Sequence, residues 1–104
     1  QAAASAVTTF FEGIRGGENS EAKFTAVAQS AHPTYRAMAR LQLASLQPGQ
    51  AQEHLRAILD DGRVPEELHH LAQLQLGERL MDEQPDEAKK LLQGLVDDDS
   101  AFNN

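Results

Sequence analysis

The sequence predicts an all-α fold built from a tandem series of helical hairpins. Apolar residues make up 40% of the 104 residues and are mostly Ala and Leu, which lose little conformational freedom in a helix. They recur at helical spacing in six segments that are separated by turns containing glycine or proline. We expect residues 1–104 to form a single domain, because a chain of this length suits one small core.

The first predicted hairpin joins helices over residues 2–15 and 20–31. Apolar residues of the first helix have i, i+3, i+4, i+7 spacing: Val7, Phe10, Phe11 and Ile14. Gly16-Gly17 ends that helix, because glycine readily adopts the left-handed conformation of a helix cap. Ser20 is predicted to be the N-cap of the second helix.

The central hairpin joins helices over residues 34–46 and 50–61. Pro33 opens its first helix at a position where the missing N–H costs nothing, Pro48-Gly49 turns the chain, and Gly62 caps the second helix. The first helix is apolar over a wide arc and the second only along a narrow stripe. This difference predicts that the first helix is packed on more than one side.

The third hairpin begins at Pro65, whose helix runs to about residue 81 with Glu66 and Glu67 in its first turn. Gly77 lies inside this helix and costs about 1 kcal/mol relative to Ala, so it predicts the close approach of another helix. The sixth helix starts near Pro85. The run at residues 97–99, three Asp, is expected to end it and to cap the start of a further helix.

The spacing of the hairpins predicts a tetratricopeptide-like solenoid of about three antiparallel helical hairpins. Pro33 and Pro65 open equivalent helices, and their separation of about 32 residues, with two helices per unit, is typical of such solenoids. Three alanines are expected at the crossing point of each hairpin, although their spacing is irregular: Ala22, Ala51 and Ala88. The chain lacks the Trp of the consensus repeat.

A closer resemblance rests on PTYRAMARLQLA, the Pro-Gly turn, AQEHLRAILDD and VPEELHHLAQLQLGERLMD. These segments resemble the tetratricopeptide-like domain of bacterial inner-membrane proteins that act as ancillary subunits of the Sec translocon, over most of residues 5–99. The resemblance implies a periplasmic interaction domain without catalytic residues, tethered by an upstream membrane helix. We therefore expect the chain to be a fragment that lacks this anchor and further downstream repeats.

The charge of the chain, −7 overall, argues against nucleic acid and anionic membrane surfaces as partners. Residues 1–52 contain 3 acids and 4 bases, which leaves 16 − 3 = 13 acids and 9 − 4 = 5 bases in residues 53–104. The acidic half is either a solvated surface or a surface for a basic partner. The absence of Cys excludes disulfides and thiolate chemistry.

The sequence predicts no catalytic residue, cofactor, metal ion or small-molecule substrate. His69 and His70 are adjacent and diverge by about 100° on a helix, so they cannot chelate one ion together. Glu66 and His70 have i, i+4 spacing, which fits either a weak metal site or a local pair. The Asp run lacks the alternating ligands of a calcium loop, and no Ser has a nucleophile-elbow context.

The candidate partner-binding residues are Tyr35, Arg36 and Arg40, on the first helix of the central hairpin. First helices line the groove of such solenoids, so Arg36 and Arg40 are expected to meet an acidic side chain or a C-terminal carboxylate of a protein or peptide. The alternative is that they pair with acids of adjacent helices. The Leu-rich fifth helix offers an apolar groove or packs against a further unit, and a homo-oligomer through the exposed solenoid end is a further expectation.

These observations predict a non-catalytic protein–protein interaction scaffold. Its expected setting is the bacterial inner membrane, with the domain facing the periplasm and assisting the Sec translocon or its chaperones. The alternative is a helical accessory or oligomerisation domain of a larger cytoplasmic protein or enzyme.

Overall fold

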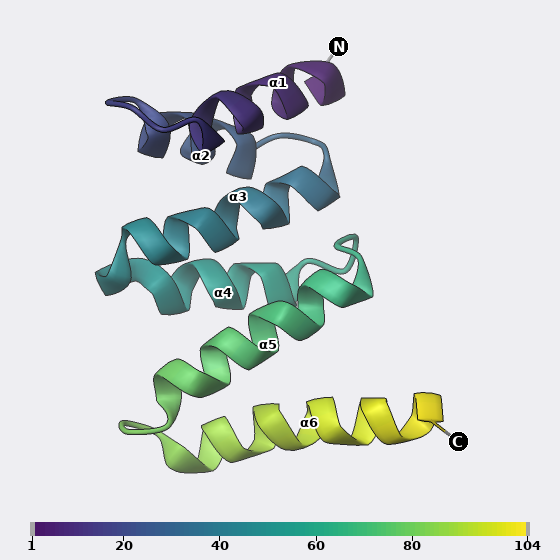
Figure 1. Cartoon of the computed structure of the whole chain (residues 1–104). Helices are drawn as coiled ribbons and strands as arrows, with labels where there is room; N and C mark the ends of the chain where they lie inside the picture. Colours follow the sequence, from purple (N-terminus) through teal and green to yellow (C-terminus); the bar gives the residue numbers. More distant parts are fainter. Residues whose placement is uncertain (1, 104) are drawn as a thin grey trace.

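The computed structural model describes the backbone of residues 2–103 and the side chains of residues 5–97. Within this range the chain forms six α-helices and one short 3₁₀ helix, and no strand (Figure 1). Their bounds are α1 Ala2–Ile14, α2 Ser20–Ala28, α3 Pro33–Leu46, η1 Pro48–Gln50, α4 Ala51–Asp60, α5 Glu66–Leu80 and α6 Pro85–Asn103. The predicted all-α class is therefore confirmed.

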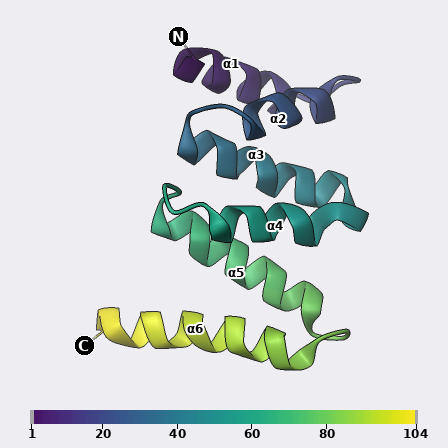
Figure 2. The same ribbon diagram turned by 180° about the vertical axis from the view of Figure 1, so that it is seen from behind.

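The helices form an open array. Each helix contacts the next along the chain, and α3 also contacts both α1 and α5. Among the helices described, α1 makes no contact with α4, α5 or α6. Figures 1 and 2 show the chain reversing direction at every turn, with the two ends of the chain at opposite ends of the stack. The molecule measures 39 × 31 × 20 Å, so consecutive hairpins stack without closing on themselves.

Helix α3 lies between two hydrophobic cores, as its wide apolar arc predicts. The N-terminal core joins α1, α2 and one side of α3: Ala6, Phe10, Phe24, Val27, Ala28, Ala39 and Leu43. The C-terminal core joins the other side of α3 to α4, α5 and α6: Ala37, Ala44, Ala51, Leu55, Ile58, Val64, Ala72, Leu76, Leu80 and Ala88. The alanines of α3 let neighbouring helices approach on both sides.

Several of the predicted helix ends are confirmed. Gly16 and Gly17 have φ values of 88° and 105°, in the left-handed region, directly after α1. Pro33 occupies the first turn of α3, whose N-cap is His32. The His32 ring accepts a hydrogen bond from the backbone N–H of Tyr35 at 3.5 Å through Nδ1. Proline and a side-chain cap therefore act together at this helix start.

Three terminal assignments were wrong by one residue. Asn19, not Ser20, is the N-cap of α2, and Ser20 instead donates a hydrogen bond from Oγ to the Gly13 carbonyl at 3.1 Å. Asp61 is the C-cap of α4, and the only described residues with positive φ are the two glycines after α1, so Gly62 is no left-handed cap. Pro65 is the N-cap of α5, which begins one residue later.

The prediction that the Asp run at 97–99 ends the sixth helix was also wrong. Helix α6 continues through this run to Asn103, and no further helix starts there. Aspartate is a weak helix former but, unlike proline, it keeps its backbone N–H and can continue the helix. Asp97 even supports the helix, because its Oδ1 accepts a hydrogen bond from Gln93 one turn earlier at 3.1 Å.

Two helix pairs approach each other closely at glycine. A Cβ at Gly77 would lie 2.9 Å from Leu92 of α6, which confirms the predicted close approach. A Cβ at Gly13 would lie 2.8 Å from the Phe24 ring of α2. The sequence separation of Gly13 and Gly77 is twice the step from Pro33 to Pro65. The first and third hairpins therefore share one mode of close contact.

The small residues at these crossings are only partly those predicted. Ala51 and Ala88 are buried, with 1% and 2% of their surfaces exposed. Ala22 is exposed, so its predicted place at the first crossing was wrong. Ser20 faces Gly13 there instead, as its hydrogen bond to the Gly13 carbonyl shows. A crossing point depends on how two helices rotate about their axes, which residue counting along the chain does not determine.

Candidate functional site

The candidate site is a polar strip on α3 that consists of Arg36, Arg40 and Gln47, called the α3 strip below. Arg36 and Arg40 are one turn apart, and Gln47 follows two turns later as the C-cap of α3. The polar contacts of the strip reach the α2–α3 connection, α2 and α4. The strip therefore runs along the side of α3 that lies between the two neighbouring second helices.

Arg36 forms the first cross-link of the strip. Its Nε donates to Oδ2 of Asp61 at 2.8 Å, and its Nη2 lies 2.7 Å from the same oxygen. Its Nη1 donates to the carbonyl oxygen of Ser30 at 3.0 Å. The two charged side chains are only 17% and 18% exposed. Arg36 thus pairs with an acid of an adjacent helix end, which was the alternative interpretation of this residue.

Asp61 connects three helices at this point. Its Oδ1 accepts a hydrogen bond from the backbone N–H of Arg63 at 3.2 Å, and its carbonyl oxygen lies 2.8 Å from Nε2 of His69 at the start of α5. Burial by itself raises the pKa of Asp61, but the hydrogen bonds from Arg36 and Arg63 and the charges of Arg36 and Arg40 together outweigh it and lower the pKa below 3.8. The carboxylate is therefore held ionised.

Gln47 forms the second cross-link. Its Oε1 lies 2.8 Å from Nε2 of His54 on α4, and its Nε2 donates to Oε2 of Glu21 on α2 at 3.2 Å. Because the amide nitrogen of Gln47 is used toward Glu21, its oxygen is the acceptor toward His54. The hydrogen of the neutral His54 ring therefore resides on Nε2, and Nδ1 carries the lone pair.

The charge environment of His54 disfavours its protonation. Burial is the largest cause that lowers its pKa below 6.5, and the positive charge of Arg40 adds to it, whereas Glu53 acts in the opposite direction. The same positive charge of Arg40 also helps to lower the pKa of Asp61. Arg40 is thus electrostatically close to both α4 groups.

Arg40 itself has no hydrogen-bond acceptor or ion-pair partner among the described residues. It is partly buried and lies between the two cross-links. Because α3 and α4 are antiparallel, the α4 position between His54 and Asp61 that faces it is Ala57, which has no acidic group. The strip therefore holds one unpaired guanidinium between two cross-links whose polar groups are already paired.

Tyr35 lies in a different environment from the two arginines. Its ring packs edge-on against Phe10 with centroids 5.3 Å apart, and against His32 with centroids 4.9 Å apart. Phe11 of α1, whose surface is 51% exposed, lies 6.2 Å from the Tyr35 ring. Tyr35 therefore belongs to an aromatic cluster where α1 meets α3, and whether it contacts a partner stays a prediction.

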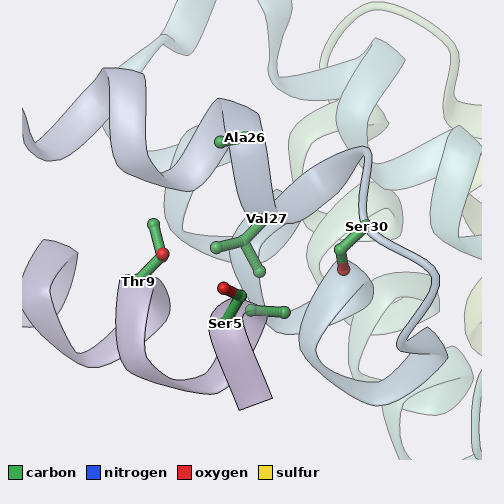
Figure 3. Close-up of a pocket in the computed structure, with 6 residues that line it drawn as sticks. Ser5, Thr9, Ala26, Val27 and Ser30 are labelled. Atoms are coloured by element: carbon green, nitrogen blue, oxygen red, sulfur yellow. The ribbon is translucent and has the colours of Figure 1, made fainter. Parts of the chain in front are cut away.

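Two hollows occur at opposite ends of the array. One, of about 250 Å³, lies between α1 and α2; Figure 3 shows Ser5 and Thr9 from α1 facing Ala26 and Val27 from α2, with Ser30 at its edge. The other, of about 260 Å³, is lined by Met81, Pro85, Ala88, Lys89 and Leu92. Met81, which lines this second hollow, is 53% exposed, and Val96 of α6 is 57% exposed. Both ends therefore present apolar surface.

Sequence reasoning identified Arg36 and Arg40 but missed Asp61, Gln47 and His54. Within residues 5–97 the structure brings together no group of three or more His, Asp or Glu side chains that suits a metal ion. None of the described helices is long and apolar enough to cross a membrane. Comparisons with protein-family models, with curated proteins and with solved structures find no match for this chain.

Proposed function

We propose that this chain is a non-catalytic protein–protein interaction scaffold with a tetratricopeptide-like arrangement of hairpins. The observation that carries the proposal is the open stacking of the helices. The first helices of the three hairpins, α1, α3 and α5, contact one another in series. Among the described residues, the second helices, α2, α4 and α6, contact only first helices and, for α4, the adjoining η1. Such quasi-linear packing leaves long surfaces available along the stack, which is how solenoid proteins bind partners.

Two further features support the solenoid. The glycines at the close helix contacts, Gly13 and Gly77, are separated along the chain by two steps of the period that relates Pro33 to Pro65. The first helix of the central unit is buried on two sides, as expected of a unit with a neighbour before and after it. Both features are what a repeat of hairpins along one direction would produce, and they support the proposal in this sense.

The proposed setting is a bacterial inner-membrane protein that presents this domain to the periplasm and assists the Sec translocon or its chaperones. The support for this setting is the resemblance of residues 5–99 to that family. The proposed partners are accordingly proteins or peptides. Of the three candidate residues, Tyr35 and Arg40 are proposed to bind them, because Arg36 is already paired with Asp61. An upstream segment would supply the membrane anchor.

Self-association is a second candidate function, and the apolar end of the array favours it. Leu74, Met81 and Val96 have between 41% and 57% of their surfaces exposed on α5, the turn that follows it, and α6. Exposed apolar side chains that gather at one end of a solenoid are typical of a surface covered by another unit or another subunit. Sedimentation velocity over a range of concentrations tests this candidate directly.

The main experiment is crosslinking of the full-length protein in native membranes, followed by identification of the captured proteins. The proposal expects translocon subunits or their chaperones among them. The control variant Leu55→Asp places a charge at a site with 0% exposure, disrupts the fold and should lose the capture. Capture that is equal for the wild type and this variant, or no capture at all, would contradict the proposed function.

A further inference from the structure

We propose that Arg40 binds a single carboxylate of a protein partner, between the two cross-links of the α3 strip. The inference rests on the proposed binding function and identifies the chemistry of its partner. It assigns different roles to the two arginines, since Arg36 is a structural residue and Arg40 is the binding residue.

The different pairing of the two arginines supports this assignment. Arg36 makes three close polar contacts, with the Asp61 carboxylate and the Ser30 carbonyl. Arg40 is the same kind of side chain one turn later, is partly buried, and has no such contact among the described residues. Among the described residues no side-chain nitrogen is both buried and without a hydrogen-bond partner, so the guanidinium nitrogens of Arg40 reach solvent and are open to a ligand. A carboxylate is the anion whose two oxygens match these donors.

The surroundings of Arg40 favour an external carboxylate over an internal one. At one end, the Asp61 carboxylate is already engaged by Arg36 and by the backbone N–H of Arg63. At the other end, Glu21 accepts its hydrogen bond from Gln47. In the antiparallel register of α3 and α4, the α4 position level with Arg40 is Ala57, which carries no acidic group. Asp61 and Glu21 are thus held in place by other donors, and no acid among the described residues forms an ion pair with Arg40.

His54 is positioned to respond to such an anion. The charged and polar groups around it are Arg40 and Gln47 from α3, Glu53 from α4 and, through Gln47, Glu21 from α2. The η1 segment carries no charge. From α5, Nε2 of His69 lies 2.8 Å from the carbonyl oxygen of Asp61, at the far end of α4 from His54. Arg40 is therefore the one cation that acts on His54 from a neighbouring element.

The direction of the coupling follows from the charges. In the free protein, burial and the charge of Arg40 lower the pKa of His54 below 6.5. A carboxylate bound to Arg40 offsets that charge and so raises the pKa of His54. At a pH between the His54 pKa of the free protein and that of the bound protein, binding is therefore accompanied by uptake of a proton. The proton enters at Nδ1, which leaves the Nε2–H bond to Gln47 intact. Affinity for the carboxylate should therefore increase as the pH falls through the pKa of His54.

The probe for this site is acetate, titrated into the isotope-labelled protein at constant ionic strength with chloride as the balancing anion. We expect saturable shifts of the Arg40 side-chain Nε–H resonance and of the His54 ring, and a higher His54 pKa at saturation. Affinity should be greater at pH about 6 than at pH about 7.5, both well above the range in which acetate itself protonates.

Two variants complete the test. Arg40→Gln should raise the His54 pKa in the free protein, remove its response to acetate and weaken acetate binding by at least about tenfold. Arg15→Gln makes the same charge change at an exposed residue just after α1. It should leave the His54 pKa, its response to acetate and the acetate affinity unchanged. Shifts spread over all cationic residues, or an unchanged response in Arg40→Gln, would overturn the inference. The proposed scaffold function is judged separately, by the crosslinking experiment, because acetate binding requires no partner.

Discussion

The N-terminal core of this domain is built around aromatic side chains, whereas the C-terminal core is entirely aliphatic. Phe10 and Phe24 are 3% and 2% exposed, and their ring centroids are 5.6 Å apart. The C-terminal core instead uses Leu, Ile, Val and Ala. The two cores meet only through α3, which contributes Ala39 and Leu43 to one and Ala37 and Ala44 to the other.

Because, among the described residues, α3 is the one helix that contributes to both cores, we expect the stability of the domain to be close to the sum of two neighbouring packing units. In an open stack each hairpin contacts only its neighbours, so a local change acts mainly on the unit that contains it. The short α2, with 9 residues, depends on a few large rings, whereas α5, with 15 residues, distributes its contacts over several leucines. Loss of one ring should therefore affect the first unit strongly.

The largest effect is expected from Phe24→Ala. Removing this buried ring should destabilise the N-terminal unit by about 3–5 kcal/mol, because it creates a cavity beside Phe10 and Gly13. Hydrogen exchange should show lost protection in α1 and α2, with α5 and α6 retained. The matched variant Leu76→Ala, at a C-terminal core site with 0% exposure, should cost about 2–5 kcal/mol with the opposite pattern. Equal loss in all helices would show that the two cores unfold as one.

A smaller effect is expected from adding one methyl group at the close contacts. Gly13→Ala and Gly77→Ala each gain up to about 1 kcal/mol of helix propensity but push against Phe24 and Leu92, at a cost of about 1–3 kcal/mol. We expect both variants to be destabilised. Gly13→Ala should be destabilised more, because the rigid ring of Phe24 cannot move aside as easily as the branched end of Leu92 can.

Gly94→Ala is the control for both glycine variants. Its added Cβ would meet only the flexible end of Gln73, at 3.3 Å, so this variant should be stabilised by up to about 1 kcal/mol. The stability change of all three variants is measured as the shift of the midpoint in denaturant unfolding, provided that the slope of free energy against denaturant concentration stays unchanged. A stabilised Gly77→Ala would mean that α6 moves freely relative to α5.

Much of the fold was predictable because each helix carries its own local signals. The proline openings, the glycine pair after α1 and the contrast between wide and narrow apolar arcs are properties of single segments, and they identified all six helices. The end of α6 was not predictable in this way. No proline or glycine follows Gly94, so whether the Asp run stops the helix depends on a balance of weak propensities.

The candidate site was less predictable because it depends on pairing between helices. The chain contains sixteen acidic residues that could pair with Arg36, and the sequence alone does not distinguish Asp61 as the partner. A usable signal did exist. His54, Ala57 and Asp61 have i, i+3, i+7 spacing on one face of the α4 hairpin arm, opposite the α3 strip. Aligning this set of residues with the α3 strip in antiparallel register would have placed Asp61 opposite Arg36 and His54 opposite Gln47.

At the ion pairs we expect an effect comparable to that of the glycine variants for the partly buried pair and no effect for the exposed pair. This extends the comparison of the two units to their polar contacts. The side chains of Arg36 and Asp61, at the junction, are 17% and 18% exposed, whereas those of Arg56 and Glu87, within the C-terminal unit, are 42% and 35% exposed. Arg36→Gln should cost about 1–2 kcal/mol, because the charged hydrogen bonds of a partly buried carboxylate are lost. Arg56→Gln should have no measurable effect, as is usual for exposed pairs.

The pH dependence of the unfolding free energy shows which of the two ion pairs contributes to stability. The folded-state pKa of Asp61 is lowered, so its contribution to stability is complete above 3.8 and is lost as the pH falls below that value through the folded pKa. Unfolding free energy measured between pH about 7 and about 3 should therefore fall less steeply at the acid end in Asp61→Asn than in the wild type. Arg36→Gln should flatten the same part of the curve and Arg56→Gln should change it less. If Arg56→Gln had the larger effect, the Arg36–Asp61 pair would contribute little to stability, and the junction between the two units would depend on apolar contacts.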